Sequence, residues 1–571
     1  MVKFKLNFFP QEVHLKTDFT AFPYYLDERA LRWIEETYTL MTTEEKIGQL
    51  FFPIGYSPDP DYLKYEILSK HPGGILFRTG ERETMIKTYD FLQKNTRIPL
   101  LTAANLESGG TGIMHEGTYY GTQMAVSASG NVENAYTLGR ICAEEARAVG
   151  VNYAFAPVVD IDINYHNPIT NVRTYGKDPD IVIEYAKRYM DACRERNVLT
   201  AIKHFPGDGV DERDQHICTS VNSLSVKEWM GSYGKVYRAL IDHGALTVMV
   251  GHIALPSYQS KGKYLPASLS HELVTDLLKE ELGFRGLVIT DATPMVGFTS
   301  VMERKKAVPQ SIMAGCDMFL FNKDYAEDYR FMLEGYKEGV LSEDRLKDAV
   351  CKILAVKAVL GLHKEVPIPS KEDISRIGCA EFEALASQLA DKACTLVKDT
   401  QTVLPISPEK HKRVLYEILG DFASNSRVEN TFVEEMTKRG YTMIPYERET
   451  FDFTKPLPFD SSESFKSKYD LVVYLANIEN ASNKTTNRIN WYTLFGLGNN
   501  MPWFVNEVPT IFISLQNPYH LLDVPMVKTY INCYQNNDAM LCSLVEKLNG
   551  ESAFSGKSPV DPFCGREELK L

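Results

Sequence analysis

The chain has 571 residues, of which 44% are hydrophobic and 24% are charged. This composition is ordinary for a globular protein and excludes wholesale disorder, while the length exceeds what one hydrophobic core usually holds, so two domains are expected. The net charge of −13 excludes a bulk electrostatic attraction for nucleic acid or anionic lipid.

The N-terminal segment and the cysteines bear on the compartment. MVKFKLNFFPQEVHLKTDF lacks the unbroken apolar core of a signal peptide, and no apolar stretch is long enough to span a membrane. The ten cysteines are scattered without a C-x-x-C pair, which predicts buried free thiols rather than disulfides or a zinc site. We therefore expect a cytoplasmic protein with no metal, no cofactor, no nucleic-acid partner and no membrane contact. The oligomeric state stays open.

Short apolar runs dominate the first 360 residues, and most are separated by amphipathic helical stretches. Such runs are too uniformly apolar for a sheet with one wet face, so they predict a parallel sheet covered on both sides. Eight strand–helix units favour a (β/α)8 barrel, with an open doubly wound sheet as the alternative. The runs are 47–55, 74–78, 99–107, 152–160, 200–206, 245–253, 286–292 and 316–321.

The pattern breaks at HKEVPIPSKEDIS, which carries two prolines and several charges. We place a linker over 363–375, between a barrel domain with an N-terminal extension over 1–362 and a second α/β domain over 376–571. The second domain shows strand-like runs at 395–397, 413–418, 471–475, 510–515 and 529–533.

Polar groups follow several of the barrel runs. Catalytic groups of such barrels lie at the C-terminal ends of the strands and on the loops that follow. The loop 207–216 (GDGVDERDQH) is rich in glycine and polar residues, so we expect it to be mobile. The strand-end residues are Asn105, Glu107, Asp160, Asp162, Lys203, His204, His252 and Asp291.

Several motifs, in order, resemble one known family. KHFPGDG (203–209) followed by Asp-Gln-His (214–216), NVRTYGKDP (171–179) and GLVITDATPMVG (286–297) look like the β-N-acetylglucosaminidase branch of glycoside hydrolase family 3. Stretches of the second domain, such as TLVKDTQTVLPI, extend the resemblance over nearly the whole chain. It implies a TIM-like barrel followed by an α/β sandwich, and a retaining exo-hydrolase that removes β-linked N-acetylglucosamine from small glycosides.

The resemblance also implies roles for individual residues. Asp291 would be the nucleophile that forms a glycosyl-enzyme ester, and His216, polarised by Asp214, the general acid and then the general base. The substrate-binding residues would be Arg173, Lys203, His204, Asn105, His252 and Met295, the last near the N-acetyl group.

The chemistry of these side chains agrees with those roles. A carboxylate nucleophile must stay ionised, and we expect Lys203 and Arg173 to favour that form. Imidazole titrates near neutral pH, which suits an acid and base. An Asp–His pair two residues apart cannot share a helix face, so the dyad requires a turn or an extended loop.

Structural explanations compete with these functional ones. Asp291 could be a helix N-cap, Lys203 a Schiff-base lysine, and His204 and His252 core histidines with satisfied ring nitrogens. For Asp160 and Asp162, a hydrogen-bonding role at the barrel rim is favoured.

Three positions depart from the family pattern. Asn105 replaces an Asp and loses a charge-assisted bond to a sugar diol, which puts the sugar preference in doubt. Asp208 replaces a His and adds a negative charge to the loop that carries His216. Gln215 replaces a Ser, a change expected to be neutral because that residue should point away from the dyad.

Other activities remain open. A β-N-acetylglucosaminide phosphorylase is one, because a neutral imidazole would not repel phosphate as a carboxylate would. A β-glucosidase of the same family is another. A non-catalytic sugar-binding protein is disfavoured, because Asp214, His216 and Asp291 are all present.

Overall fold

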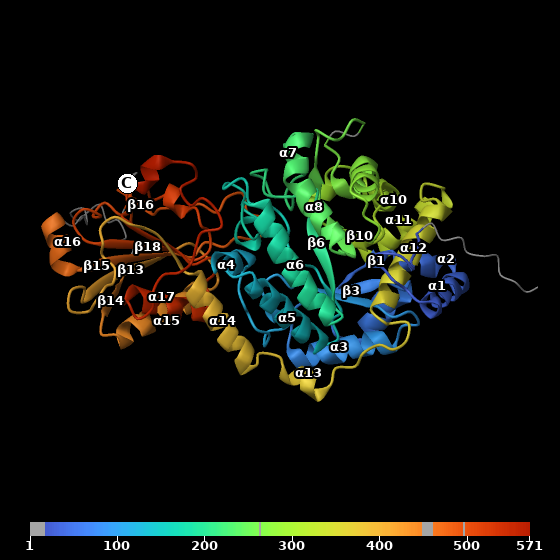
Figure 1. Ribbon diagram of the computed structural model, residues 1–571, viewed down its shortest axis with the longest axis horizontal. Coiled ribbons are helices and arrows are strands. Elements are labelled where there is room, and N and C mark those ends of the chain that lie inside the picture. Colours follow the sequence, from blue (N-terminus) through green and yellow to red (C-terminus); the bar gives the residue numbers. More distant parts are fainter. Residues whose placement is uncertain (1–16, 262–263, 448–460, 495–496, 499) are drawn as a thin grey trace, which may run out of the picture.

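The computed structural model describes residues 17–261, 264–447, 461–494, 497–498 and 500–571. The segment 1–16, where the sequence predicts no signal peptide, lies outside the described residues. Two bodies lie side by side: a barrel built from the first 360 residues, and a second sheet with its helices built from the last 190 or so (Figure 1).

The barrel sheet is parallel throughout. Its strands are short and fully apolar because helices cover one face and side chains fill the other. Neighbouring residues therefore enter different cores, as when Ile289 packs in one cluster and Val288 in another. The sheet order is β10-β8-β6-β5-β4-β3-β2. The strands are β2 Ile54–Gly55, β3 Gly74–Phe77, β4 Leu101–Ala104, β5 Tyr153–Ala154, β6 Leu199–Phe205, β8 Thr247–Val250 and β10 Leu287–Thr290.

The eighth position closes the sheet. Strand β1 (Phe51–Phe52) pairs in parallel with β11 (Phe319–Leu320), and a parallel bridge joins Ile289 of β10 to Met318. The first apolar run thus supplies two strands, β1 and β2, which pair with opposite neighbours. All eight predicted runs therefore carry strands, and the predicted barrel is confirmed.

Helices cover the outside of the barrel and follow the strands in sequence. Several begin at the capping residues that their sequences offer; α2, for example, has a capping box between Thr42 and Glu45. The stretch 271–284, predicted as a helix, forms the π-helical segment η6 (Glu272–Glu281). The main helices are α1 Glu28–Leu40, α2 Thr43–Gln49, α3 Arg82–Lys94, α4 Gln123–Ala128, α5 Glu133–Arg147, α6 Pro179–Glu195, α7 Val226–Gly231, α8 Tyr233–Asp242, α10 Arg304–Ala314, α11 Tyr325–Lys337 and α12 Glu343–Val359.

The second body has a six-stranded sheet in the order β12-β19-β18-β15-β13-β14, parallel except where β12 meets β19. Five of its strands match predicted runs, and β14 was not predicted. The strands are β12 Thr395–Asp399, β13 Arg413–Leu419, β14 Thr442–Pro445, β15 Leu471–Ala476, β18 Thr510–Ser514 and β19 Thr529–Asn532. The helices of this body include α14 Ala380–Ala393, α15 Asn425–Lys438, α16 Ser462–Lys468 and α17 Asp538–Leu548.

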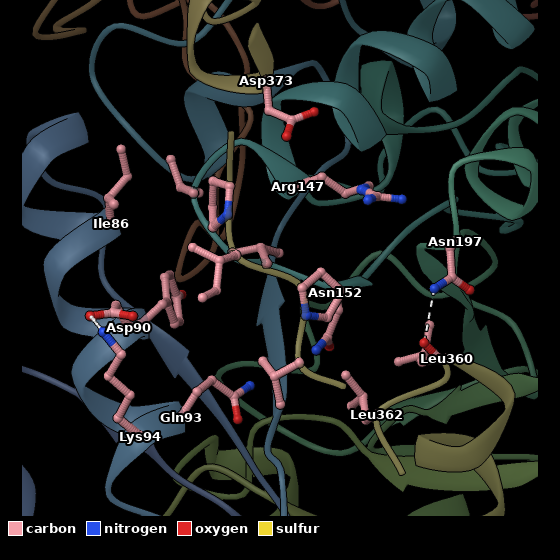
Figure 2. A pocket seen from close by; sticks show the side chains of 18 residues that line it. Ile86, Asp90, Gln93, Lys94, Arg147, Asn152, Asn197, Leu360, Leu362 and Asp373 are labelled. Atoms are coloured by element: carbon pink, nitrogen blue, oxygen red, sulfur yellow. Dashed lines mark hydrogen bonds and ion pairs between the residues drawn. The ribbon is translucent and has the colours of Figure 1, made fainter. Parts of the chain in front are cut away.

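The predicted linker crosses the end of the barrel where the strands begin. Beyond α12, residues 366–369 and the short helix α13 (Lys371–Ser375) cover a cavity of about 160 Å³ beside α3 (Figure 2). Its polar side chains serve the fold, since the Asn197 amide donates to the carbonyl of Leu360 at 2.9 Å and Asn152 bonds the backbone of β4. This end lies opposite the strand ends at which catalytic groups are expected.

Within the described part of the chain, no helix is both long and apolar enough to cross a membrane. All ten cysteines are described, and each is a free thiol.

Candidate active site

Asp291 lies directly after β10, at the barrel mouth. Its backbone N–H donates to the carbonyl of Val250 at 2.8 Å, and its own Oδ1 accepts from the N–H of Ala292 at 2.7 Å. Burial raises the pKa of Asp291, but His204, His252 and His216 outweigh it and hold the pKa below the ordinary value. The carboxylate therefore stays ionised, as a nucleophile requires. The cause differs from the prediction, which assigned this effect to Lys203 and Arg173.

The Asp214–His216 contact expected from the sequence is present. The ring nitrogen Nδ1 of His216 donates to Oδ1 of Asp214 at 2.7 Å, and the backbone N–H of His216 donates to the same oxygen at 2.9 Å. Asp214 is fully buried, whereas the His216 side chain is 23% exposed. The dyad reaches the loop after Asp291, because the N–H of Val296 donates to the carbonyl of His216 at 3.0 Å. The second ring nitrogen of His216 is thus left for proton transfer beside Asp291.

Glu107, Arg173 and Lys203 form one ionic cluster at the mouth. The guanidinium of Arg173 donates to both oxygens of Glu107 at 2.9 Å, and Lys203 Nζ lies 2.7 Å from Oε1. Burial raises the pKa of Glu107, but the two cations outweigh it and hold that pKa well below the ordinary value of 4.5. The carboxylate fixes the direction in which both cations point. Glu107 was noted only as a strand-end carboxylate.

His204 lies between two carboxylates. Its Nδ1 donates to Oδ2 of Asp160 at 2.7 Å, and its Nε2 is 3.9 Å from Oδ2 of Asp291. Asp160 also accepts from the backbone N–H groups of His204 and Asp208 at 3.0 and 2.8 Å. Asp160 thus has the hydrogen-bonding rim role that was favoured for it, and it orients His204 toward Asp291.

His252 and Met295 are buried beside the nucleophile loop. His252 Nε2 donates to the carbonyl of Ala292 at 3.0 Å, and its Nδ1 accepts from Ser268 Oγ at 2.8 Å. Burial lowers the pKa of His252 to about 4, so the ring is neutral. Because both ring nitrogens are engaged, the geometry favours the core explanation for His252 over sugar binding. Met295 is 7% exposed and starts the helix α9 (Val296–Thr299).

The loop 207–216 is tethered by its own polar side chains, contrary to the expected mobility. Asp208 is buried and accepts from Asn167 Nδ2 at 3.0 Å and from Gln215 Nε2 at 3.4 Å. The other amide atom of Gln215 accepts from the N–H of His252 at 2.7 Å. Burial and the neighbouring Asp160 raise the pKa of Asp208. The two departures from the family pattern, Asp208 and Gln215, therefore contact each other, and Gln215 is not a free neutral position.

A cleft of about 400 Å³ opens at the mouth beside the ionic cluster. Asn105 is exposed there, and both domains line the cleft. Sequence reasoning missed the second domain's share. The one available signal was the density of asparagines, five of them between 477 and 490. Lining residues include Asn105, Glu107, Ser108, Tyr119 and Arg173 from the barrel, and Asn480, Ala481 and Ser482 from the second domain.

A buried hydrogen bond also joins the domains at the rim. Tyr519 of the second domain donates to Oδ2 of Asp162 at 2.6 Å, and Thr170 donates to Oδ1 at 3.2 Å. Burial raises the pKa of Asp162 to about 6. Asp162 therefore has the rim role favoured for it.

Comparisons with known proteins agree with this geometry. Residues 42–356 match the model of the glycosyl hydrolase family 3 N-terminal domain. A "beta-N-acetylglucosaminidase/beta-glucosidase" from Cellulomonas fimi is 42% identical over 568 residues, which is 97% of this chain and 100% of that protein. A solved structure described as "beta-glucoside phosphorylase BglX bound to 2FGlc" is 42% identical, with a TM-score of 0.90 over 96% of this chain and 99% of that one. A family 3 β-N-acetylglucosaminidase from Paenibacillus sp. str. FPU-7 shares the fold at 24% identity, with a TM-score of 0.77 over 91% of this chain and 99% of that one.

Proposed function

The chain belongs to glycosyl hydrolase family 3 and is a glycoside hydrolase, and from this premise we propose that it removes β-linked N-acetylglucosamine or glucose from the ends of small glycosides by a retaining mechanism. The observation that carries the proposal is the arrangement of Asp291 and His216. Both lie at the same mouth, and a backbone hydrogen bond ties the loop of one to the loop of the other. A sugar bound there would meet a carboxylate on one side and an imidazole on the other.

The first step forms a covalent intermediate. The Asp291 carboxylate attacks the anomeric carbon, the glycosidic bond breaks, and the His216 imidazolium gives its proton to the leaving oxygen. Asp214 keeps a proton on Nδ1 of His216, so that the proton delivered comes from Nε2. Arg173, Lys203 and His204 hold the sugar hydroxyls, since Glu107 and Asp160 already fix the directions of these side chains.

The second step reverses the first. The neutral His216 takes a proton from an incoming water, the water oxygen attacks the anomeric carbon, and the ester bond to Asp291 breaks. The released sugar keeps its β configuration because the carbon has been inverted twice.

A second candidate is transfer of the sugar to phosphate. Two observations favour it: a solved relative at 42% identity is described as a β-glucoside phosphorylase, and the acid and base here is an imidazole rather than a carboxylate. A neutral imidazole does not repel a phosphate dianion, whereas a carboxylate would.

The test is a panel of aryl β-glycosides of glucose, N-acetylglucosamine and galactose, with and without phosphate. Turnover of the first two supports the proposal, and no turnover of any of them contradicts it. Formation of glycosyl phosphate, with faster turnover in phosphate, selects the second candidate over hydrolysis. An activated 2-deoxy-2-fluoro glucoside should add one sugar to the intact protein, and peptide mapping should place the sugar on Asp291.

A further inference from the structure

A segment of the second domain reaches into the mouth of the barrel. It follows β15 and begins at Asn477. Residues 480–482 line the same cleft as Asn105 and Arg173. The next residue, Asn483, donates its backbone N–H to Oδ2 of Asp214 at 2.7 Å. The segment therefore touches both the sugar-binding side of the cleft and the proposed acid–base dyad.

The contact with Asp214 completes the hydrogen bonding of a buried carboxylate. Oδ1 of Asp214 accepts both donors of His216, and Oδ2 accepts the N–H of Asn483. Burial raises the pKa of Asp214, whereas the bonds from His216 and Asn483 lower it, and the result lies below the ordinary value. If the Asn483 N–H moved away, Oδ2 would lose this partner in a buried place and the carboxylate could turn, taking the His216 ring with it.

The backbone at Asn483 is in the left-handed region, with φ of 68°. Glycine adopts this conformation without strain, asparagine tolerates it, and β-branched residues are rare there. The direction of the donated N–H depends on this conformation. The identity of the side chain therefore matters even though the bond is made by the backbone.

A ring of four asparagine side chains anchors the segment to both domains. Asn171, two residues before Arg173, accepts from Asn480 at 3.4 Å and donates to Asn517 at 3.2 Å. Asn517 donates to the carbonyl of Asn487 at 3.2 Å, and the Asn487 side chain donates to Asn480. Three of the four are buried, namely Asn171, Asn487 and Asn517. The ring holds the segment at a fixed position over the mouth.

We propose that the second-domain segment 480–483 is a working part of the active site, in which the backbone of Asn483 is a positioning group for the Asp214–His216 dyad. Residues 481 and 482 then form the wall on the side where the leaving group departs, because the dyad they adjoin protonates the leaving-group oxygen. This inference rests on the proposed function, since it takes His216 as the acid.

The test changes the backbone preference at residue 483. Asn483→Gly keeps the N–H and the left-handed conformation, so its kcat/KM should stay within about twofold of the wild type. Asn483→Val strains that conformation, and Asn483→Ala strains it less. Both should lose more on a phenyl glycoside, which needs protonation, than on a dinitrophenyl glycoside, which does not. For Asn483→Val we expect losses of about tenfold or more against about threefold or less.

The matched control is Asn197→Val. Asn197 also has a positive φ, 55°, but it lies at the opposite end of the barrel. This variant should unfold at a lower temperature while keeping the wild-type ratio between the two glycosides. Circular dichroism checks that each variant is folded; should Asn483→Val not fold, Asn483→Ala decides.

Two results would overturn the inference: an unchanged ratio in the folded Asn483 variants, or an equal shift in Asn197→Val. A wild type that cleaves no glycoside would instead overturn the proposed function, and that result appears before any variant is made.

Discussion

Replacing Glu107 by Gln removes one negative charge from between two cations and leaves the shape of the side chain unchanged. Gln offers a single carbonyl oxygen, so Arg173 loses its two-pronged partner and Lys203 loses its counter-charge. Both cations remain at the mouth with fewer partners. We expect lower stability and weaker catalysis, because the same carboxylate stabilises and orients the two side chains.

The magnitude follows from the contacts. Glu107 accepts three charged hydrogen bonds at 2.9, 2.9 and 2.7 Å. A hydrogen bond to a charged group contributes about 1 kcal/mol more than a neutral one, so the change costs about 3 kcal/mol before screening. The side chain is 18% exposed, and partial screening by water brings the expected loss to about 2 kcal/mol. We expect kcat/KM for an aryl glycoside to fall about ten- to hundredfold as the cations lose orientation.

The assay is urea unfolding at several pH values, because urea, unlike guanidinium, does not screen charge. The folded pKa of Glu107 lies well below 4.5. Its stabilising effect is therefore complete above that ordinary value and is lost as the pH falls through the folded value. The gap between wild type and Glu107→Gln should be constant from pH 8 to about pH 5 and should narrow in more acidic buffer.

Glu144→Gln is the matched control. Glu144 also accepts from two arginines, Arg196 at 3.0 Å and Arg376 at 2.9 Å, and its side chain is 23% exposed. It lies on α5 on the outside of the barrel, so it should lose stability and keep full activity. Equal activity of Glu107→Gln and the wild type, or equal loss in both variants, would refute the role given to the ionic cluster.

Three further outcomes are expected. Asp291→Ala should lose more than about a thousandfold in turnover of an activated aryl glycoside, and a variant that keeps its activity would remove the nucleophile assignment. His216→Ala should lose about a hundredfold on a phenyl glycoside and far less on a dinitrophenyl glycoside, whereas equal losses would contradict the acid role. Asp162 has a folded pKa raised to about 6, so the wild type should lose about 2 kcal/mol of unfolding free energy as the pH rises from about 4 to 7. Asp162→Asn cannot ionise and should lose none of it; parallel pH profiles from urea unfolding would show that Asp162 is not the cause.

Much of the barrel could be predicted from the sequence because each strand must be apolar on both faces. Runs such as 245–253 and 286–292 announced β8 and β10 for this reason. The split of the first run into β1 and β2 was not foreseen, because it depends on which neighbour each half pairs with. Strand β14 was missed because it lies at a sheet edge, is half-exposed and ends in Pro445, so it lacks an apolar run.

The candidate site was predictable where it depends on strand ends. Parallel strands bring their C-terminal ends to one mouth, so Asp291 and His204 could be placed together without coordinates. The tethering of the loop 207–216 was not predictable, because Asp208 and Gln215 bond each other across a turn that only the fold creates. Asn483 was out of reach for a different reason: its contribution is a backbone N–H, which every residue except proline possesses.

The path of the chain has a consequence for synthesis. The barrel's last strand, β11, is made well before residue 483, and the chain then crosses the far end of the barrel before it returns to the mouth. On a ribosome, N-terminal domains generally fold first. A nascent barrel would hold Asp214 and Asp162 with donors missing until the second half of the protein emerges. Competence to process sugar is then acquired only near the end of translation, which keeps unfinished chains inert.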